Sequence, residues 1–400
     1  KRLLQKKIDL CPMRFSIPLL LALLCPGLAR SSRQEVAIPF FSEQLTVAYS
    51  SDMLFASSVN IQEKSLVGYY QRLNQTDFSV LLDDLNRKKT ALGLNDWLYY
   101  DLMRRVVDKI YVQKKPLERE LVCWFLLSQS GYDTRLTYLD DRVFLYVYTK
   151  EEVFEAPMIE ENGRNYVNLT ALNQASRSQQ ALYLLNFVAQ PKGKAFSFQL
   201  TKLPNLSPRL RPRKLHFMFE GLMREITVQT DENVVQLMKS YPLIAESSYI
   251  EAPLTATAAA SLLPELRELI EGRRPDQAIA CLVAFTRSAF IYKEDKEAFG
   301  RSKPMIPDEV LFYPHSDCED RVALFYYLVK TLLDLPMVVV AYHDHLTIGV
   351  AIPGYRGSAV KHKGREFFIC DPTGPVNSSE IGFIPEGYEN ESFEIISTYK

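Results

Sequence analysis

Two stretches of the chain align with each other without a gap, and this internal repeat constrains the fold more than any other feature. Each matched residue in the second half lies 203 positions after its counterpart in the first half. Both stretches read as a helix followed by strands, so the chain is expected to contain two copies of one α+β unit. The matched segments are 121–126 (LVCWFL) with 324–329 (LFYYLV), 141–147 (DRVFLYV) with 344–350 (DHLTIGV), and 166–170 (YVNLT) with 369–373 (ICDPT).

Apolar patterning divides the chain into four parts and predicts the fold class α+β. Residues 1–30 read as a signal peptide with an upstream extension, and residues 31–182 as an N-terminal α+β domain that holds the degenerate copy of the repeat. Residues 183–255 are expected to be β-rich, because they contain alternating apolar runs that are typical of strands. Prolines separate these runs. Residues 256–400 carry the second copy, with helices followed by several strands.

The amino end has the pattern of a secretory signal peptide. Arg14 precedes a short apolar run over 17–24, and small residues follow, so cleavage is expected after Ala29. The residues before Met13 either extend the basic region or lie upstream of the true start. A lipid anchor at Cys25 is the alternative outcome. No other stretch approaches the ~20 apolar residues of a membrane span, so the protein is expected to be secreted or periplasmic, attached to a membrane only through such an anchor.

Charge and composition exclude several classes of function. Lys and Arg number 47 against 48 Asp and Glu, and the formal net charge of -1 gives no global field that would attract nucleic acid. Six cysteines in 400 residues are too few for a disulfide scaffold. Phosphate loops, dinucleotide fingerprints and calcium loops are missing from the sequence, so no cofactor is implied.

The densest cluster of reactive side chains lies at 313–325. Ser316 and Glu319 fit a capping box that would start a helix, which places Cys318 in the first turn. Unpaired N–H groups and the helix dipole favour a thiolate there and could receive an oxyanion. The dipole contributes only ~0.3 to 2 kcal/mol, and three neighbouring carboxylates oppose the thiolate, so Cys318 needs a cationic partner.

His345 and Asp371 can complete a nucleophilic site. His345 is expected to begin a strand after a turn at Asp344, and Asp371 follows the strand 366–370. A nucleophilic cysteine requires a base within hydrogen-bond reach and a third group that orients the base. The order and element types of Cys318, His345 and Asp371 meet this requirement.

Three motifs around these residues resemble those of the transglutaminase-like superfamily. They are Asp-Cys-Glu-Asp at 317–320, His-Leu-Thr-Ile-Gly-Val at 345–350 and Phe-Ile-Cys-Asp-Pro-Thr-Gly-Pro at 368–375, in the order of that family. The resemblance covers about 275–390 and is to bacterial exported members. Ser316 departs from the pattern, because bacterial members often have Gly before the Asp-Cys pair.

The resemblance implies a C-terminal papain-like domain with a catalytic triad. Cys318 would be the nucleophile, His345 the general base and acid, and Asp371 the residue that fixes the imidazole. The family also places an upstream side chain in its oxyanion hole, for which Tyr313 and His315 are both candidates.

The first copy of the repeat lacks these groups. It would position substrate or pack against the working copy, because its side chains supply neither a thiol nor a titrating base. At the common offset the pairs are Cys318 with Lys115, His345 with Arg142, and Asp371 with Asn168.

The predicted function is cysteine-dependent acyl transfer by an exported peptidase or amidohydrolase. Its partner would be a peptide or protein substrate, with cell-wall peptide among the open choices. One alternative is a binding or scaffold protein of the cell envelope that keeps the triad without turnover. Another is a zinc-binding hydrolase, because His343 and His345 would face the same way on one extended strand.

Overall fold

The structure is a computed structural model that describes residues 32–172, 182–374, 380–385 and 387–400. The predicted signal peptide, with its cleavage site after Ala29 and the anchor candidate Cys25, lies outside these residues. The described part mixes helices and strands, in agreement with the α+β class. No helix within it is long and apolar enough to cross a membrane.

The first half of the chain runs from a β-hairpin through helices to a five-stranded sheet. The hairpin is β1 (Arg33–Phe40) and β2 (Glu43–Ser50). The helices are η1 (Ser51–Leu54), α1 (Glu63–Leu73), α2 (Ser79–Ala91), α3 (Asp96–Ile110) and α4 (Pro116–Gln129). The sheet and its last helix are β3 (Thr134–Leu139), β4 (Arg142–Thr149), β5 (Met158–Glu161), β6 (Arg164–Asn168), α5 (Leu169–Leu172) and β7 (Tyr183–Leu184).

The second half repeats this plan with extra short elements before its central helix. It opens with β8 (Leu210–Phe219), β9 (Leu222–Asp231), α6 (Glu232–Lys239), α7 (Glu246–Ile250), α8 (Ala256–Ile270) and α9 (Pro275–Ser288). The extra elements are β10 (Ile291–Tyr292), α10 (Asp295–Phe299), α11 (Pro307–Phe312) and β11 (His315–Ser316). The remainder is α12 (Cys318–Leu332), β12 (Met337–Ala341), β13 (Leu346–Val350), β14 (Ala359–His362), β15 (Arg365–Ile369) and β16 (Glu394–Tyr399).

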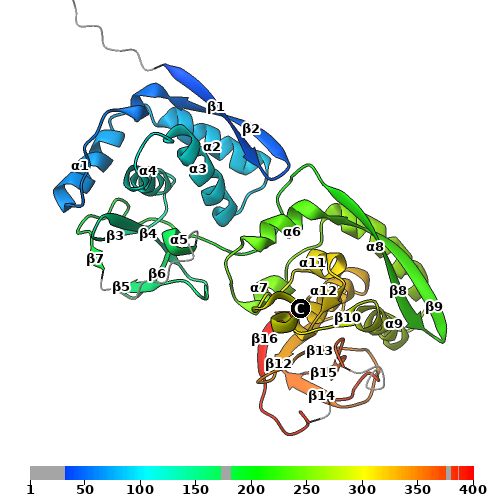
Figure 1. The fold of residues 1–400 in the computed structure, drawn as a ribbon. Coiled ribbons are helices and arrows are strands. Elements are labelled where there is room, and N and C mark those ends of the chain that lie inside the picture. The colour runs from blue at the N-terminus through cyan, green and yellow to red at the C-terminus, as the bar shows by residue number, and fades with distance from the viewer. Residues whose placement is uncertain (1–31, 173–181, 375–379, 386) are drawn as a thin grey trace, which may run out of the picture.

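The two five-stranded sheets have the same strand order. The first runs β5-β6-β4-β3-β7 and the second β14-β15-β13-β12-β16, and all neighbours are antiparallel. In each half a helix comes directly before the first strand of the sheet. Figure 1 shows the halves as two lobes, the first in blue and cyan and the second in green to red.

Strand registers correct one pairing of the repeat. Thr134 lies opposite Val147 in the first sheet and Met337 opposite Val350 in the second, which keeps the offset of 203. The next strands do not keep it, because Val147 lies opposite Val167 whereas Val350 lies opposite Phe368. The first half has two more residues between these strands. Counted along β15, the counterpart of Asp371 is therefore Thr170 rather than Asn168.

The helices differ by one residue at their starts. Helix α4 begins at Pro116 and α12 at Cys318, but they end at Gln129 and Leu332, which keeps the offset of 203. These ends are consistent with the pairing of Cys318 with Lys115, the N-cap of α4. The paired positions of the first half supply no thiol and no carboxylate.

Each half buries its own apolar core, and the predicted middle region 183–255 is shared between the two. The hairpin β8–β9 packs into the second core through residues such as Phe217 and Val228. Residues 232–250 are mostly helical rather than β-rich, and Val234 and Leu237 of α6 belong to the first core. The apolar residues at 234, 235, 237 and 238 are spaced along one helical face, which explains the helix.

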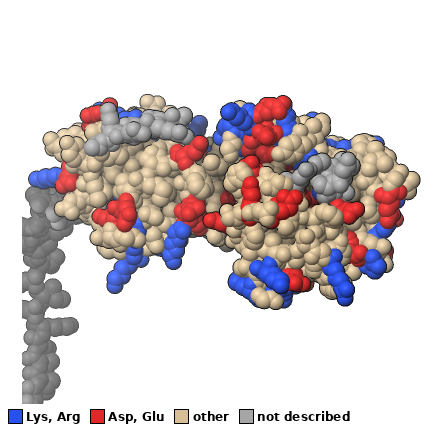
Figure 2. Space-filling model, turned by 90° about the horizontal axis from the view of Figure 1, so that it is seen from below, with Lys and Arg blue, Asp and Glu red and all other residues tan. Residues whose placement is uncertain are grey.

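Both signs of charge are distributed over the surface. Figure 2 shows Lys and Arg interspersed with Asp and Glu on one face of both halves. This distribution is consistent with a formal net charge of -1.

Candidate active site

Cys318 is the first residue of helix α12. Asp317 is the N-cap, and the carboxylate of Asp320 accepts a hydrogen bond from the Asp317 N–H at 3.2 Å. The predicted box of Ser316 and Glu319 is therefore wrong by one residue. The reason is that Ser316 belongs to strand β11, which pairs with β10, so the helix cannot start until the chain leaves that strand.

The Cys318 thiol is held in its protonated form. Burial raises the pKa of the thiol well above its ordinary value, and the Glu319 carboxylate raises it further. The thiol donates a hydrogen bond to Glu319, with 3.0 Å between Sγ and Oε2. The backbone N–H of Leu346 faces the sulfur and opposes these effects by lowering the pKa. Leu346 directly follows His345, so the sulfur lies against the start of β13.

His345 and Asp371 form an ion-pair contact. The distance from His345 Nε2 to Asp371 Oδ2 is 3.4 Å, and both side chains are largely buried. Thr373 donates from its hydroxyl to Asp371 Oδ1 at 2.6 Å and from its N–H at 3.0 Å. Burial raises the pKa of Asp371, but the hydrogen bonds from His345 and Thr373 outweigh it and lower the pKa overall. Asp371 is therefore an ionised acceptor for the imidazole.

Two tyrosines flank the sulfur and the imidazole. The ring of Tyr388 stacks on His345 with centroids 5.2 Å apart, and its hydroxyl donates to Asp344 at 2.7 Å. That hydrogen bond, with burial and nearby charges that include Cys318, raises the pKa of Tyr388 to about 12. Burial and then Cys318 raise the pKa of Tyr292 to about 12. Both phenols therefore lie within electrostatic range of the sulfur.

Tyr292 is a site residue that sequence reasoning missed. It lies on β10, in register with Ser316 of β11, so a strand pairing brings it to the nucleophile. Two residues of strand are too short to show a pattern, and no local signal in the sequence marks this position.

A cavity of about 470 Å³ opens beside the imidazole. Its wall combines two guanidinium groups with aromatic rings and the loop that follows Asp371. The lining residues are Arg287, Phe290, Tyr292, Arg321, His345, Thr373 and Gly374.

The two oxyanion candidates lie together, outside the wall of this cavity. Tyr313 and His315 stack with an interplanar angle of 7° and centroids 6.3 Å apart. The ring of Phe299 makes T-shaped contacts with both rings. Their role in an oxyanion hole stays a prediction.

The two histidines of the zinc alternative take different partners. His343 is exposed and lies 2.9 Å from Glu391, whereas His345 turns to Asp371. The part of the chain that the structure describes contains one group of side chains close enough to share an ion, and it includes neither histidine. That group is Asp295, Asp317 and Glu319.

Burial also acts on the carboxylates around the nucleophile. It raises the pKa of Asp317 to about 7, with a further contribution from Glu319, and the pKa of Asp295 to about 6. Asp317 accepts a hydrogen bond from the Asp295 N–H at 3.3 Å. These acids carry less negative charge near neutral pH than their number suggests, which reduces their repulsion of a thiolate.

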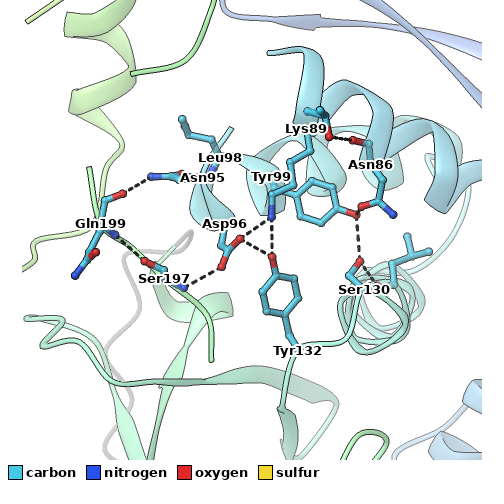
Figure 3. Close-up of polar contacts among 12 residues, drawn as sticks. Asn86, Lys89, Asn95, Asp96, Leu98, Tyr99, Ser130, Tyr132, Ser197 and Gln199 are labelled. Atoms are coloured by element: carbon cyan, nitrogen blue, oxygen red, sulfur yellow. Dashed lines mark hydrogen bonds and ion pairs between the residues drawn. The ribbon is translucent and has the colours of Figure 1, made fainter. Parts of the chain in front are cut away.

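A second polar cluster, in the first half, is structural. Figure 3 shows Asp96 at its centre, accepting from Lys89 at 2.6 Å and from the Tyr132 hydroxyl at 2.5 Å. The other oxygen of Asp96 accepts from the Ser197 N–H at 3.1 Å. These contacts connect α2 and α3 to the segment around Ser197. The partners saturate the Asp96 carboxylate, which is therefore not available as a base or as a ligand.

Comparison of the chain with protein-family models, with curated proteins and with solved structures gives no match. Inferences about function therefore depend on the geometry of the site around Cys318.

Proposed function

We propose that the protein is an exported cysteine-dependent acyl-transfer enzyme that acts as a peptidase or amidohydrolase. One observation carries this proposal. The chain brings the sulfur of Cys318 against the N–H of Leu346, and the preceding residue, His345, is paired with Asp371. A nucleophile, a base and an orienting carboxylate from three separate elements thus lie close together, and the imidazole lines the cavity, which is the arrangement that acyl transfer requires.

The imidazole contacts give each ring nitrogen a role. Nε2 faces Asp371, so Nδ1 is the nitrogen that takes the thiol proton. The sulfur then attacks the amide carbonyl and a tetrahedral oxyanion forms. His345 returns the proton to the leaving amine, and a C–N bond breaks to give a thioester on Cys318. Water attacks the thioester with His345 as base and releases the acid.

Two donors are available for the oxyanion. The N–H of Cys318 lies in the first turn of α12, where backbone donors have no acceptor within the helix. The hydroxyl of Tyr292 is the second donor, because this residue lies near the sulfur and lines the cavity. Such donors stabilise the charge that develops on the carbonyl oxygen.

The protonated thiol makes proton transfer part of the reaction. A preformed thiolate–imidazolium pair is opposed by burial and by Glu319. His345 therefore acts as a general base during attack. Glu319 is only partly buried, so its carboxylate can turn from the sulfur towards solvent when substrate enters.

We also propose that the second half is a transglutaminase-like domain and the first half its degenerate copy. The shared strand order and the conserved hairpin offset support this. Lys115, Arg142 and Thr170 occupy the triad positions of the first half, so its role would be structural or in positioning substrate.

A non-catalytic binding or scaffold protein of the cell envelope is the second candidate. The observation that favours it is the hydrogen bond from the Cys318 thiol to Glu319, because a protonated thiol is a weak nucleophile.

Thiol alkylation and acyl-enzyme trapping separate the two candidates. The other cysteines of the described chain, Cys123, Cys281 and Cys370, are buried, so alkylation of the folded mature protein should map to Cys318. An enzyme should form an acyl adduct on Cys318 with amide or ester substrates, seen by mass spectrometry, and His345→Gln should abolish it. A scaffold should form no adduct, and its thiol should react with iodoacetamide at the same rate with or without His345.

A further inference from the structure

Two buried arginines give the cavity beside His345 a positive wall. Arg287 of α9 is 6% exposed and Arg321 of α12 is 2% exposed, and both line the cavity. Burial lowers the pKa of Arg321, and the neighbouring Arg287 lowers it further, so two like charges lie close together. Two guanidinium groups in so small a space are costly unless negative charge compensates them. Burial lowers the pKa of Arg287, and the Asp371 carboxylate opposes this by raising it, so Asp371 supplies part of that charge.

The hydrogen bonds of Arg321 leave donors unused. Its Nε donates to the Ser316 hydroxyl at 3.1 Å, Nη2 to the Phe290 carbonyl at 2.8 Å, and Nη1 to the Thr373 carbonyl at a longer 3.4 Å. All three acceptors are neutral. A guanidinium has five N–H donors, so two remain without an acceptor among the described residues.

Nearby carboxylates compensate this charge only in part. Asp317 and Asp320 raise the pKa of Arg321 through space, but within the described chain no carboxylate oxygen lies at ion-pair distance from Arg321. Arg287 donates a hydrogen bond through Nη2 to the backbone carbonyl of Asp371. This bond fixes the guanidinium next to a residue of the proposed triad. The arrangement holds both groups rigidly, as a binding site for an anion requires.

We propose that this cavity binds a carboxylate of the acyl donor through Arg287 and Arg321, and so selects amides that carry a negative charge close to the scissile carbonyl. This inference rests on the proposed acyl transfer and names its substrate class. The aromatic walls of Phe290 and Tyr292 would pack on the apolar part of the same group. Arginine suits this task because its planar fork matches the two oxygens of a carboxylate.

The test compares two alkylating reagents on the same sulfur. Iodoacetate is an anion and iodoacetamide is its neutral counterpart. The rate constant for iodoacetate divided by that for iodoacetamide, both measured at Cys318, therefore reports the local preference for negative charge. Changes in thiol pKa affect both reagents alike and cancel in the ratio. The unfolded chain in urea supplies the reference ratio. In the folded protein the ratio should exceed the reference by about tenfold, because hydrogen bonds to charged groups are the strong ones, and 1 M NaCl should reduce it.

Substitution identifies the groups responsible. Arg287→Met and Arg321→Met should each lower the ratio towards the reference, whereas Arg267→Met, at an exposed position of α8, should leave it unchanged. Circular dichroism shows which variants fold. Should both cavity variants unfold, the ratio of the native protein and its salt dependence still decide the question.

Each outcome bears on a different part of the proposal. A ratio at or below the reference overturns the anion site, and reactivity that still depends on His345 would leave acyl transfer standing. A Cys318 that reacts with neither reagent in the folded protein overturns acyl transfer and the anion site together. In a turnover assay, a peptide amide with a free carboxylate should have a lower KM than its carboxamide analogue, and equal values contradict the inference.

Discussion

Replacing Glu319 by Gln tests the cause of the raised thiol pKa. The substitution keeps the size of the side chain and removes its charge. Full charges 3.0 Å apart would repel by about 5 kcal/mol at an effective dielectric constant of ~20. Glu319 is partly exposed, and solvent screening reduces this to about 1.4 to 3 kcal/mol. The thiol pKa of the Glu319→Gln variant should therefore fall by about one to two units, at 1.36 kcal/mol per unit.

The assay is the rate of iodoacetamide labelling at Cys318 as a function of pH. Below the thiol pKa, each unit of decrease gives about ten times more thiolate, but intrinsic nucleophilicity falls with a Brønsted coefficient of ~0.4 to 0.5. The labelling rate at pH 7 should therefore rise about three- to tenfold in the variant. Glu297→Gln is the matched control, because Glu297 is exposed on α10 with 73% of its side chain in solvent.

Two results would refute this reasoning. One is an unchanged pH profile in the Glu319→Gln variant, which would mean that burial alone sets the thiol pKa. The other is an equal shift in the Glu297→Gln variant, which would show a general effect of net charge rather than the contact at the sulfur.

Three further predictions concern the proposed triad and the packing of strand β13. His345→Gln should reduce kcat by about 10² to 10⁴-fold through loss of the general base, whereas His343→Gln, at an exposed position, should stay near wild type in steady-state kinetics. The lowered pKa of Asp371 stabilises the fold above its ordinary pKa of 3.8, and this contribution is lost as the pH falls through the lowered value. The free energy of unfolding in urea should therefore decrease below about pH 4 in the wild type, and should decrease less in the Asp371→Asn variant. An equal pH dependence in the two proteins would contradict this. Gly349→Ala should cost about 1 to 3 kcal/mol in urea unfolding, because a Cβ there would lie 2.9 Å from Phe367 Cβ and 3.1 Å from Val338 Cγ2. Gly68→Ala, in open space on α1, should instead stabilise by about 0.5 to 1 kcal/mol, and a reversed order of the two would rule out the steric argument.

Local sequence predicted the elements that carry the proposed triad. Apolar spacing after Cys318 marks the buried face of α12, and short apolar runs mark the strands beside His345 and before Asp371. These signals are strong because strands such as β12 and β13 are buried on both faces, and a continuous apolar run shows this within a few residues. The helix start was misplaced by one residue, since the pairing of Ser316 with Tyr292 connects segments that are distant in the chain.

Features that depend on long-range contacts were not predictable in the same way. The two extra residues between β4 and β5 moved the counterpart of Asp371 from Asn168 to Thr170, and a gapless alignment cannot reveal such a change. Arg287 and Arg321 read as ordinary helix residues, because their convergence on one cavity depends on how α9 and α12 pack. The neutral partners of Arg321 are backbone carbonyls and a hydroxyl, which leave no charge pattern in the sequence.

The separate cores of the two halves have a consequence for inactivation. The apolar side chains of each lobe pack mainly against one another. Heat or denaturant can therefore unfold one lobe while the other keeps its secondary structure. Turnover would disappear with the carboxyl-terminal lobe alone, and far-ultraviolet ellipticity would then survive in an inert sample. Some residues after the hairpin β8–β9 are exceptions. Val234 and Leu237 of α6, Tyr249 of α7 and Ile306 belong to the amino-terminal core, although the hairpin before them belongs to the other. Mechanical strain between the lobes would be transmitted through these contacts.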